Sequence, residues 1–300
     1  MAFPARLPAV WLANTAARVA LASGVGYVAA AYTVSRFLTR PRRRKLRSTP
    51  RTVDLAFEPL QLLTDDRIRL AGWLVEPPAP RGTVALFHGM RHTREQMLGR
   101  ITFLHAAGYR CVAIDHRAHG ASRGKRVSFG WYEARDVTAV ADLIRRRWPH
   151  EPRVALGISM GAAAIAFAGP SCGWRGVVLE GIYADVGQAF RRRIGRYYPR
   201  WFSRLYPGVM WITQRRVKVS VAQIRPVDAV TALADGPTLF VTGEDDFLAP
   251  PEDARRVAAA AGARAELFVV PGAGHNNVAE VGGPAYRERL LGFLEKVLHQ

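Results

Sequence analysis

Residues 153–164 decide the fold and read Arg153-Val154-Ala155-Leu156-Gly157-Ile158-Ser159-Met160-Gly161-Ala162-Ala163-Ala164. An apolar run typical of a buried strand enters Gly157-x-Ser159-x-Gly161, and an Ala-rich run typical of a helix leaves it. A sharp turn between strand and helix strains its central residue and leaves no room for bulky side chains two positions away, a demand that glycine meets. We therefore predict that Ser159 stands on such a turn, with the N–H groups of the following helix directed at the site.

The bare G-x-S-x-G pattern also fits a simple glycine-bounded turn with an exposed serine, so residues elsewhere must decide. A serine hydroxyl becomes a good nucleophile when a histidine takes its proton and a carboxylate orients that histidine. Downstream, one strand-like run ends in Gly243-Glu244-Asp245-Asp246, and a later one ends in a glycine-rich loop that carries His275. The order serine, acid, histidine is the one expected for a strand–turn–helix nucleophile.

Five short motifs occur in a fixed order along the chain. They are His88-Gly89, Asp115-x-Arg117-x-His119-Gly120-x-Ser122, Gly157-x-Ser159-x-Gly161, Gly243-x-x-Asp246-x-x-x-Pro250 and Gly274-His275. Together they resemble the α/β-hydrolase superfamily, in particular small serine hydrolases with lysophospholipase-like or serine-aminopeptidase-like cores. The resemblance covers about residues 52–300. It implies a mostly parallel eight-stranded sheet flanked by helices, a catalytic triad, and no cofactor or metal.

The resemblance also assigns roles to single residues. The acid of the family usually follows the strand-ending glycine by three positions and precedes a proline by four, which selects Asp246 over Asp245. Asp185, just after an apolar strand, is a third candidate, because some members carry the acid there. The oxyanion-hole N–H groups are expected at Met160 and Met90.

A second group of polar residues is tempting as a catalytic cluster, but the family pattern gives it a structural role. We expect these side chains to order the loops after two strands: His88, Asp115, Arg117, His119 and Ser122. No His, Cys, Asp and Glu set shows metal-ligand spacing.

The positive charge of the chain is confined to two segments. The net charge is +19, and residues 1–51 and 186–227 each carry ten Lys or Arg and no acid, whereas the remainder has 23 basic and 24 acidic residues. No nucleic-acid-binding module is recognisable, so we expect an anionic membrane surface, rather than nucleic acid, as the partner of these segments.

The N-terminal segment predicts association with a membrane. Residues 19–35 are uncharged, Arg18 and Arg36 bracket them, and a basic run at 40–47 comes next. Three interpretations remain open: a transmembrane helix, an amphipathic helix on the membrane surface, and a cleaved signal peptide with its processing site at residues 29–31. The positive-inside rule places the chain beyond the basic run in the cytoplasm. We therefore divide the chain into a membrane-associating part, 1–51, and a hydrolase domain, 52–300.

The remaining pattern predicts alternating strands and helices. Two strands, 53–57 and 68–75, flank a turn at Asp65-Asp66, and helices are expected at 94–107, 131–147, 160–169, 251–262 and 284–298. Residues 183–232 interrupt the alternation, and we call them the lid segment. Arginines and aromatics interleave there, which fits a helix with a solvated basic face, or a lid that shapes the acyl pocket and contacts anionic headgroups. A protein–protein contact is the third alternative.

The function predicted from these residues is hydrolysis of acyl or lipid-like carboxylic esters through an acyl-enzyme. A peptidase or amidase on the same triad is the alternative, because the choice of leaving group depends on pocket shape. A non-catalytic binding protein on a hydrolase fold is the third hypothesis, and an intact triad speaks against it.

Overall fold

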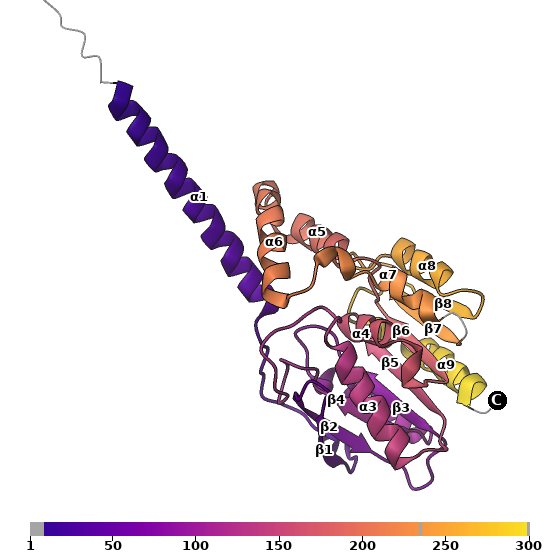
Figure 1. Cartoon of the computed structure of the whole chain (residues 1–300). Helices are drawn as coiled ribbons and strands as arrows, with labels where there is room; N and C mark the ends of the chain where they lie inside the picture. Colours follow the sequence, from indigo (N-terminus) through magenta and orange to yellow (C-terminus); the bar gives the residue numbers. More distant parts are fainter. Residues whose placement is uncertain (1–8, 234–235, 299–300) are drawn as a thin grey trace, which may run out of the picture.

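A computed structural model describes residues 9–233 and 236–298 (Figure 1). Within these residues one sheet contains eight strands, ordered in space β1-β2-β4-β3-β5-β6-β7-β8. Strand β2 pairs antiparallel with both β1 and β4, and all other neighbours are parallel. The strands are β1 (Glu58–Leu63), β2 (Arg69–Val75), β3 (Thr83–Phe87), β4 (Arg110–Ile114), β5 (Arg153–Ile158), β6 (Gly176–Glu180), β7 (Thr238–Gly243) and β8 (Ala265–Val270). The predicted fold class is confirmed.

The first strand lies further along the chain than predicted, and the assignment of 53–57 to a strand is wrong. Residues Pro50–Val53 form a 3-10 helix, and Asp54 follows in the left-handed conformation with φ 57°. An extended strand cannot pass through that residue. Pairing begins at Glu58 instead, where Leu60 and Leu62 alternate with exposed neighbours and are buried against the core. The predicted Asp65-Asp66 turn does join β1 to β2.

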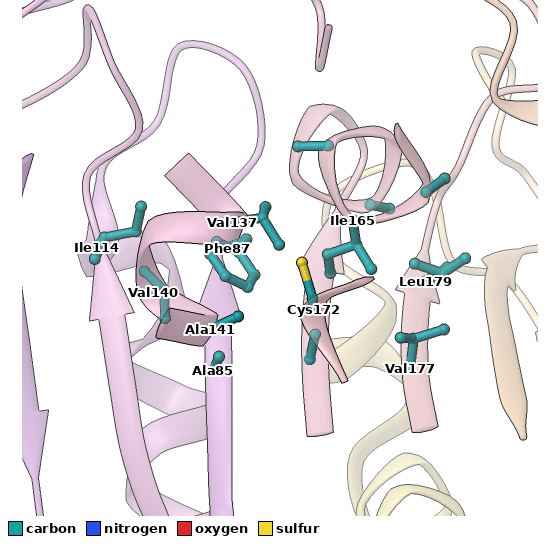
Figure 2. Close-up of a cluster of buried hydrophobic side chains, with 14 of the residues drawn as sticks. Ala85, Phe87, Ile114, Val137, Val140, Ala141, Ile165, Cys172, Val177 and Leu179 are labelled. Carbon is teal, nitrogen blue, oxygen red and sulfur yellow. The ribbon is translucent and has the colours of Figure 1, made fainter. Parts of the chain in front are cut away.

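Helices cover both faces of the sheet because alternate residues of the central strands point to opposite sides. Figure 2 shows one face, where Ala85 and Phe87 of β3 lie beneath Val137 and Val140 of α3 (Ala134–Arg147). The intervening residues Val84 and Leu86 belong to the core on the other face. Helices α4 (Met160–Ala168) and α8 (Pro251–Ala260) cover the first face, and α2 (Leu98–Ala106) and α9 (Val278–Leu298) cover the second. Burial on both faces explains why these strands are apolar throughout.

Most helices lie within a few residues of their predicted positions. Residues 94–107 begin as a 3-10 turn, Arg94–Met97, before α2. Helix α9 begins six residues earlier than predicted, at Val278, and has a kink at Gly283, where φ is 47°. Pro284 is accommodated because a new helical segment begins after the kink, and proline is favoured at the first position of a helix.

The lid segment connects β6 to β7 and is largely helical. Its longer helices are α5 (Val186–Tyr197) and α6 (Tyr206–Val217), separated by the 3-10 helix η4 (Arg200–Leu205). Short helical turns complete it: η5 (Val221–Gln223), α7 (Pro226–Ala229) and η6 (Val230–Leu233).

Helix α1 (Ala9–Thr39) packs against the lid segment at one end and projects away from the domain at the other (Figure 1). Ser35 and Thr39 are fully buried, and the Thr213 hydroxyl of α6 lies 3.0 Å from Ser35 Oγ. Residues 13–29, in contrast, are exposed on every face of the helix. Within the described chain, Ala13–Thr39 is the helix long and apolar enough to cross a membrane, a test that a signal sequence or a core helix can also pass. Only 6% of its apolar window is buried, which distinguishes it from a core helix.

Candidate active site

Ser159 stands on the turn between β5 and α4 in a conformation that is rare for a residue with a side chain. Its φ is 51° and its ψ is −106°. The main chain holds it there, since Ser159 N donates to Glu180 O at 2.7 Å. A Cβ on Gly157 would lie 2.5 Å from the Gly161 carbonyl carbon, and one on Gly161 would lie 2.3 Å from Phe87 O. Glycine at both positions is therefore a steric requirement of the turn.

His275 lies between Ser159 and Asp246 and is hydrogen-bonded to both. Its Nε2 is 2.9 Å from Ser159 Oγ, and its Nδ1 is 2.7 Å from Asp246 Oδ2. The carboxylate orients the ring so that Nδ1–H donates to Asp246, which leaves Nε2 as the acceptor for the serine proton. This arrangement can activate Ser159 as a nucleophile.

The turn after β7 explains why Asp246, and neither of its rivals, reaches the histidine. Asp246 is 2% exposed, and its Oδ1 accepts from the N–H groups of Leu248 and Ala249, both at 2.9 Å. Asp245 is exposed to solvent. Asp185 is the N-cap of α5, where its Oδ1 accepts from the backbone N–H at position 188.

The two residues expected to form an oxyanion hole both line the cavity that contains Ser159. Met160 is the first residue of α4, so its N–H lies at the positive end of that helix. In the loop after β3, Gly89 N donates to Gln96 Oε1 at 2.8 Å, and Arg91 N donates to His119 Nε2 at 3.2 Å. Among the described residues the Met90 N–H, between them, has no hydrogen-bond acceptor. The assignment of Met90 N–H to an oxyanion hole stays a prediction.

The polar residues near this loop make structural contacts. His88 is fully buried, with Nδ1 2.7 Å from Gly89 O, and its Nε2 accepts from His116 N at 2.9 Å. Burial lowers the pKa of His88 well below its usual value and that of His119 to about 4, so both rings are neutral acceptors at neutral pH. Asp115 accepts from Arg94 N and Nη1 at 2.8 and 2.7 Å. These contacts hold the loop that carries Met90.

The Ser159 cavity is mostly apolar and has a volume of about 50 Å³. Its walls include Phe129, Tyr183, Phe190 and Leu248, with Arg193 as a charged member. The rings of Phe129 and Phe190 meet edge to face at 5.0 Å, and Tyr183 OH donates to Phe129 O at 2.5 Å. Three of these wall residues, Tyr183, Phe190 and Arg193, lie in the lid segment. The sequence pattern did not single out Phe129, Tyr183 or Phe190, because no local motif marks them. Within the described residues no group of three or more His, Cys, Asp or Glu side chains is placed to hold a metal ion.

A mostly parallel sheet of this strand order, with a serine on the turn after β5 and a helix beginning at once, defines an α/β-hydrolase. The model of the family described as serine aminopeptidase, S33, matches residues 78–229. That match spans half of the chain, and the chain belongs to this family of hydrolases. A model described as TAP-like protein matches residues 206–297.

Individual relatives are more distant. The uncharacterized protein YqkD of Bacillus subtilis is 26% identical over 237 residues, which cover 76% of each chain. A monoacylglycerol lipase of Mycolicibacterium smegmatis is 34% identical over 88 residues, covering 29% of this chain and 31% of the lipase. Among solved structures, the Pyrococcus furiosus esterase Pf2001 has a TM-score of 0.74 at 21% identity, over 86% of this chain and 98% of that chain. A carboxyl esterase of Bacillus coagulans has a TM-score of 0.63 at 16% identity, over 81% and 99%.

Proposed function

We propose that this protein is a serine hydrolase that cleaves carboxylic esters through an acyl-enzyme on Ser159. The observation that carries the proposal is the continuous hydrogen-bonded chain from Ser159 Oγ through His275 to a buried Asp246 carboxylate. A histidine held in one tautomer beside a serine on a strained turn is the arrangement that general-base activation needs.

The proposed reaction has two stages. Ser159 Oγ attacks the ester carbonyl while His275 Nε2 takes its proton, and the N–H groups of Met160 and Met90 bind the resulting oxyanion. The tetrahedral intermediate then breaks its bond to the alkoxy oxygen, and His275 gives the proton to the departing alcohol. In the second stage water attacks the acyl-enzyme with His275 again as base, which releases the carboxylic acid and restores Ser159. Asp246 stabilises the imidazolium in both stages.

The lining of the cavity favours esters over aminopeptidase substrates. An aminopeptidase must bind a free α-ammonium group, which calls for a carboxylate near the scissile bond. The described residues around this cavity include no carboxylate on its wall, and Arg193 adds a positive charge that would repel an ammonium. The apolar walls suit an acyl chain, and the monoacylglycerol lipase and the two esterases are similar proteins with names of that class.

Labelling with a fluorophosphonate tests the nucleophile directly. Wild-type protein should be labelled, Ser159→Ala should not, and Ser171→Ala, at an exposed serine, should be labelled like the wild type. Parallel assays with esters and aminoacyl amides then separate the two enzyme hypotheses. Cleavage of amides without cleavage of any ester would refute the ester proposal, and folded wild type that is not labelled would favour the binding-protein hypothesis.

We also propose that α1 anchors the enzyme to a membrane with the hydrolase domain on the cytoplasmic side. Two features support this: residues 13–29 are exposed all round, and the basic run 40–47 lies directly after the helix. Tyr27 OH donates to Arg204 O at 3.1 Å, so the lid segment contacts α1 near the C-terminal end of the exposed residues 13–29. Exposed aromatics and arginines, the side chains suited to an anionic membrane surface, occur there: Tyr197, Tyr198, Trp201, Trp211, Arg196, Arg200, Arg204 and Arg215.

A further inference from the structure

A second, small cavity, of about 40 Å³, lies between α1 and the lid segment. One wall comes from α1 and the opposite wall from α5, η4 and α6; the lining includes Val34, Phe37, Leu38, Ile194, Phe202 and Met210. We call it the α1 chamber. Its existence depends on the docking of α1, because the helix supplies an entire side of it.

The α1 chamber is adjacent to the Ser159 cavity. Phe190 and Arg193 line both, so a single layer of side chains separates the two spaces. Phe190 is 6% exposed and packs on Phe129, which is in the wall of the Ser159 cavity. The partially buried Val34, Leu38 and Met90 belong to the same apolar cluster as Phe190. A passage between the two cavities would therefore run past Phe190 and Arg193.

The lining of the α1 chamber suits a hydrocarbon chain. Its two charged members are Arg91 and Arg193, and within residues 9–233 and 236–298 neither forms an ion pair with an acid. The Arg91 guanidinium lies 4.3 Å from the centroid of the Phe37 ring, and that of Arg193 lies 5.8 Å from the Tyr197 ring. Both charges thus stack on aromatic faces, which leaves the aliphatic stems available to the chamber.

We propose that the two cavities form one acyl site, with the ester carbonyl at Ser159 and the distal part of a long acyl chain in the α1 chamber. The proposal rests on the proposed ester hydrolysis at Ser159. The occupant is the acyl chain of an ester lipid, because the α1 wall of the chamber continues along the helix, past residues 30–33, into the exposed and mostly apolar residues 13–29. Helix α1 then acts as a specificity-determining part of the substrate site, and Val34 sets the acyl length that is accepted.

Two substitutions at one position test this in the full-length protein, solubilised in detergent. The assay measures kcat/KM for p-nitrophenyl butyrate and laurate. Val34→Trp fills the chamber and should lower the laurate-to-butyrate ratio about tenfold or more. Val34→Ala enlarges it and should raise that ratio. Val25→Trp, on the exposed part of α1, is the matched control and should leave the ratio unchanged.

The outcomes separate this proposal from the one on which it rests. A wild type that hydrolyses no ester overturns both. If the wild type cleaves butyrate and neither Val34 variant alters the ratio, the α1 chamber is not an acyl site, while ester hydrolysis stands. Should Val34→Trp fail to fold, judged by loss of fluorophosphonate labelling, the result with Val34→Ala decides alone: a raised ratio supports the chamber and an unchanged ratio overturns it.

Discussion

The main-chain oxygen of Glu180 accepts a 2.7 Å hydrogen bond from Ser159 N, and the side chain of the same residue is a buried carboxylate. Arg100 holds that carboxylate through Nε at 3.0 Å and Nη2 at 2.5 Å, and Tyr286 OH also donates to it. Burial by itself would lower the pKa of Arg100, but Glu180 and Tyr286 outweigh it and raise that pKa. The strained turn that carries Ser159 is therefore hydrogen-bonded to Glu180, the last residue of β6. Arg100 of α2 and Tyr286 of α9 hold the side chain of that residue.

Removal of the Glu180 charge should therefore destabilise the fold around the nucleophile. Glu180→Gln leaves the Arg100 guanidinium buried without a counter-charge, which we expect to lower the free energy of unfolding by roughly 3–5 kcal/mol. Glu58→Gln is the control, because the Glu58–Arg147 pair is exposed and should contribute less than about 1 kcal/mol. Urea unfolding followed by circular dichroism measures both. Equal effects of the two substitutions would contradict this account.

Two adjacent acids should differ greatly in their effect on activity. Asp246→Asn removes the carboxylate that orients His275 and should lower kcat by about 10⁴-fold, with little change in KM. Asp245→Asn changes an exposed side chain and should leave kcat within about twofold of the wild type. Steady-state kinetics with a short-chain ester gives both values. A comparable loss in Asp245→Asn would mean that the wrong acid has been assigned to the triad.

Acid should weaken the fold through His119. Burial lowers the pKa of this residue from 6.5 to about 4, so below pH 6.5 the unfolded chain binds a proton that the folded chain does not. The free energy of unfolding therefore falls as pH decreases from 6.5 towards 4, by about 2 kcal/mol at pH 5 from this residue. Asp66, whose pKa is held at about 2 because hydrogen bonds from Arg117 and Thr64 outweigh the effect of burial, loses its contribution only at lower pH.

Urea unfolding at pH 7 and pH 5 checks the contribution of His119. The difference between the two pH values should shrink by about 2 kcal/mol in His119→Gln. The same change at the exposed His150 should leave the difference as in the wild type. An unaltered difference in His119→Gln would show that other groups govern the acid response.

A charge in the exposed part of α1 should release the protein from membranes. Leu21 is 70% exposed on α1, and an arginine within a bilayer costs about 2.5–3.5 kcal/mol, so Leu21→Arg together with Val25→Arg should move protein from the membrane fraction to the soluble one. Leu63→Arg, at a position 60% exposed on β1, controls for a general gain in solubility. Flotation with liposomes that contain anionic lipid gives the bound fraction. Wild-type protein that remains at the bottom of the gradient would refute the anchor.

Local steric and hydrophobic constraints made much of this molecule predictable. The glycines at 157 and 161 are required by atoms within the turn and by the neighbouring β3, and the uninterrupted apolar run at 83–87 reflects burial on both faces of the sheet. The order of Ser159, acid and His275 along the chain follows the order of the strands that carry them. The sequence by itself thus determined the fold class and the candidate nucleophile.

The tertiary structure decided features that depend on residues far apart in the chain. A local hydrophobic pattern could not place the start of β1, because Asp54 adopts a left-handed conformation and pairing with β2 selects Leu60 and Leu62 for the core. Likewise, only the direction of the β7 turn separates buried Asp246 from exposed Asp245. The contact between Ser35 and Thr213 joins positions 178 residues apart, and with it α1 becomes a wall of the chamber beside the Ser159 cavity. Local sequence patterns do not reveal such contacts, because the two partners come together only when the chain has folded.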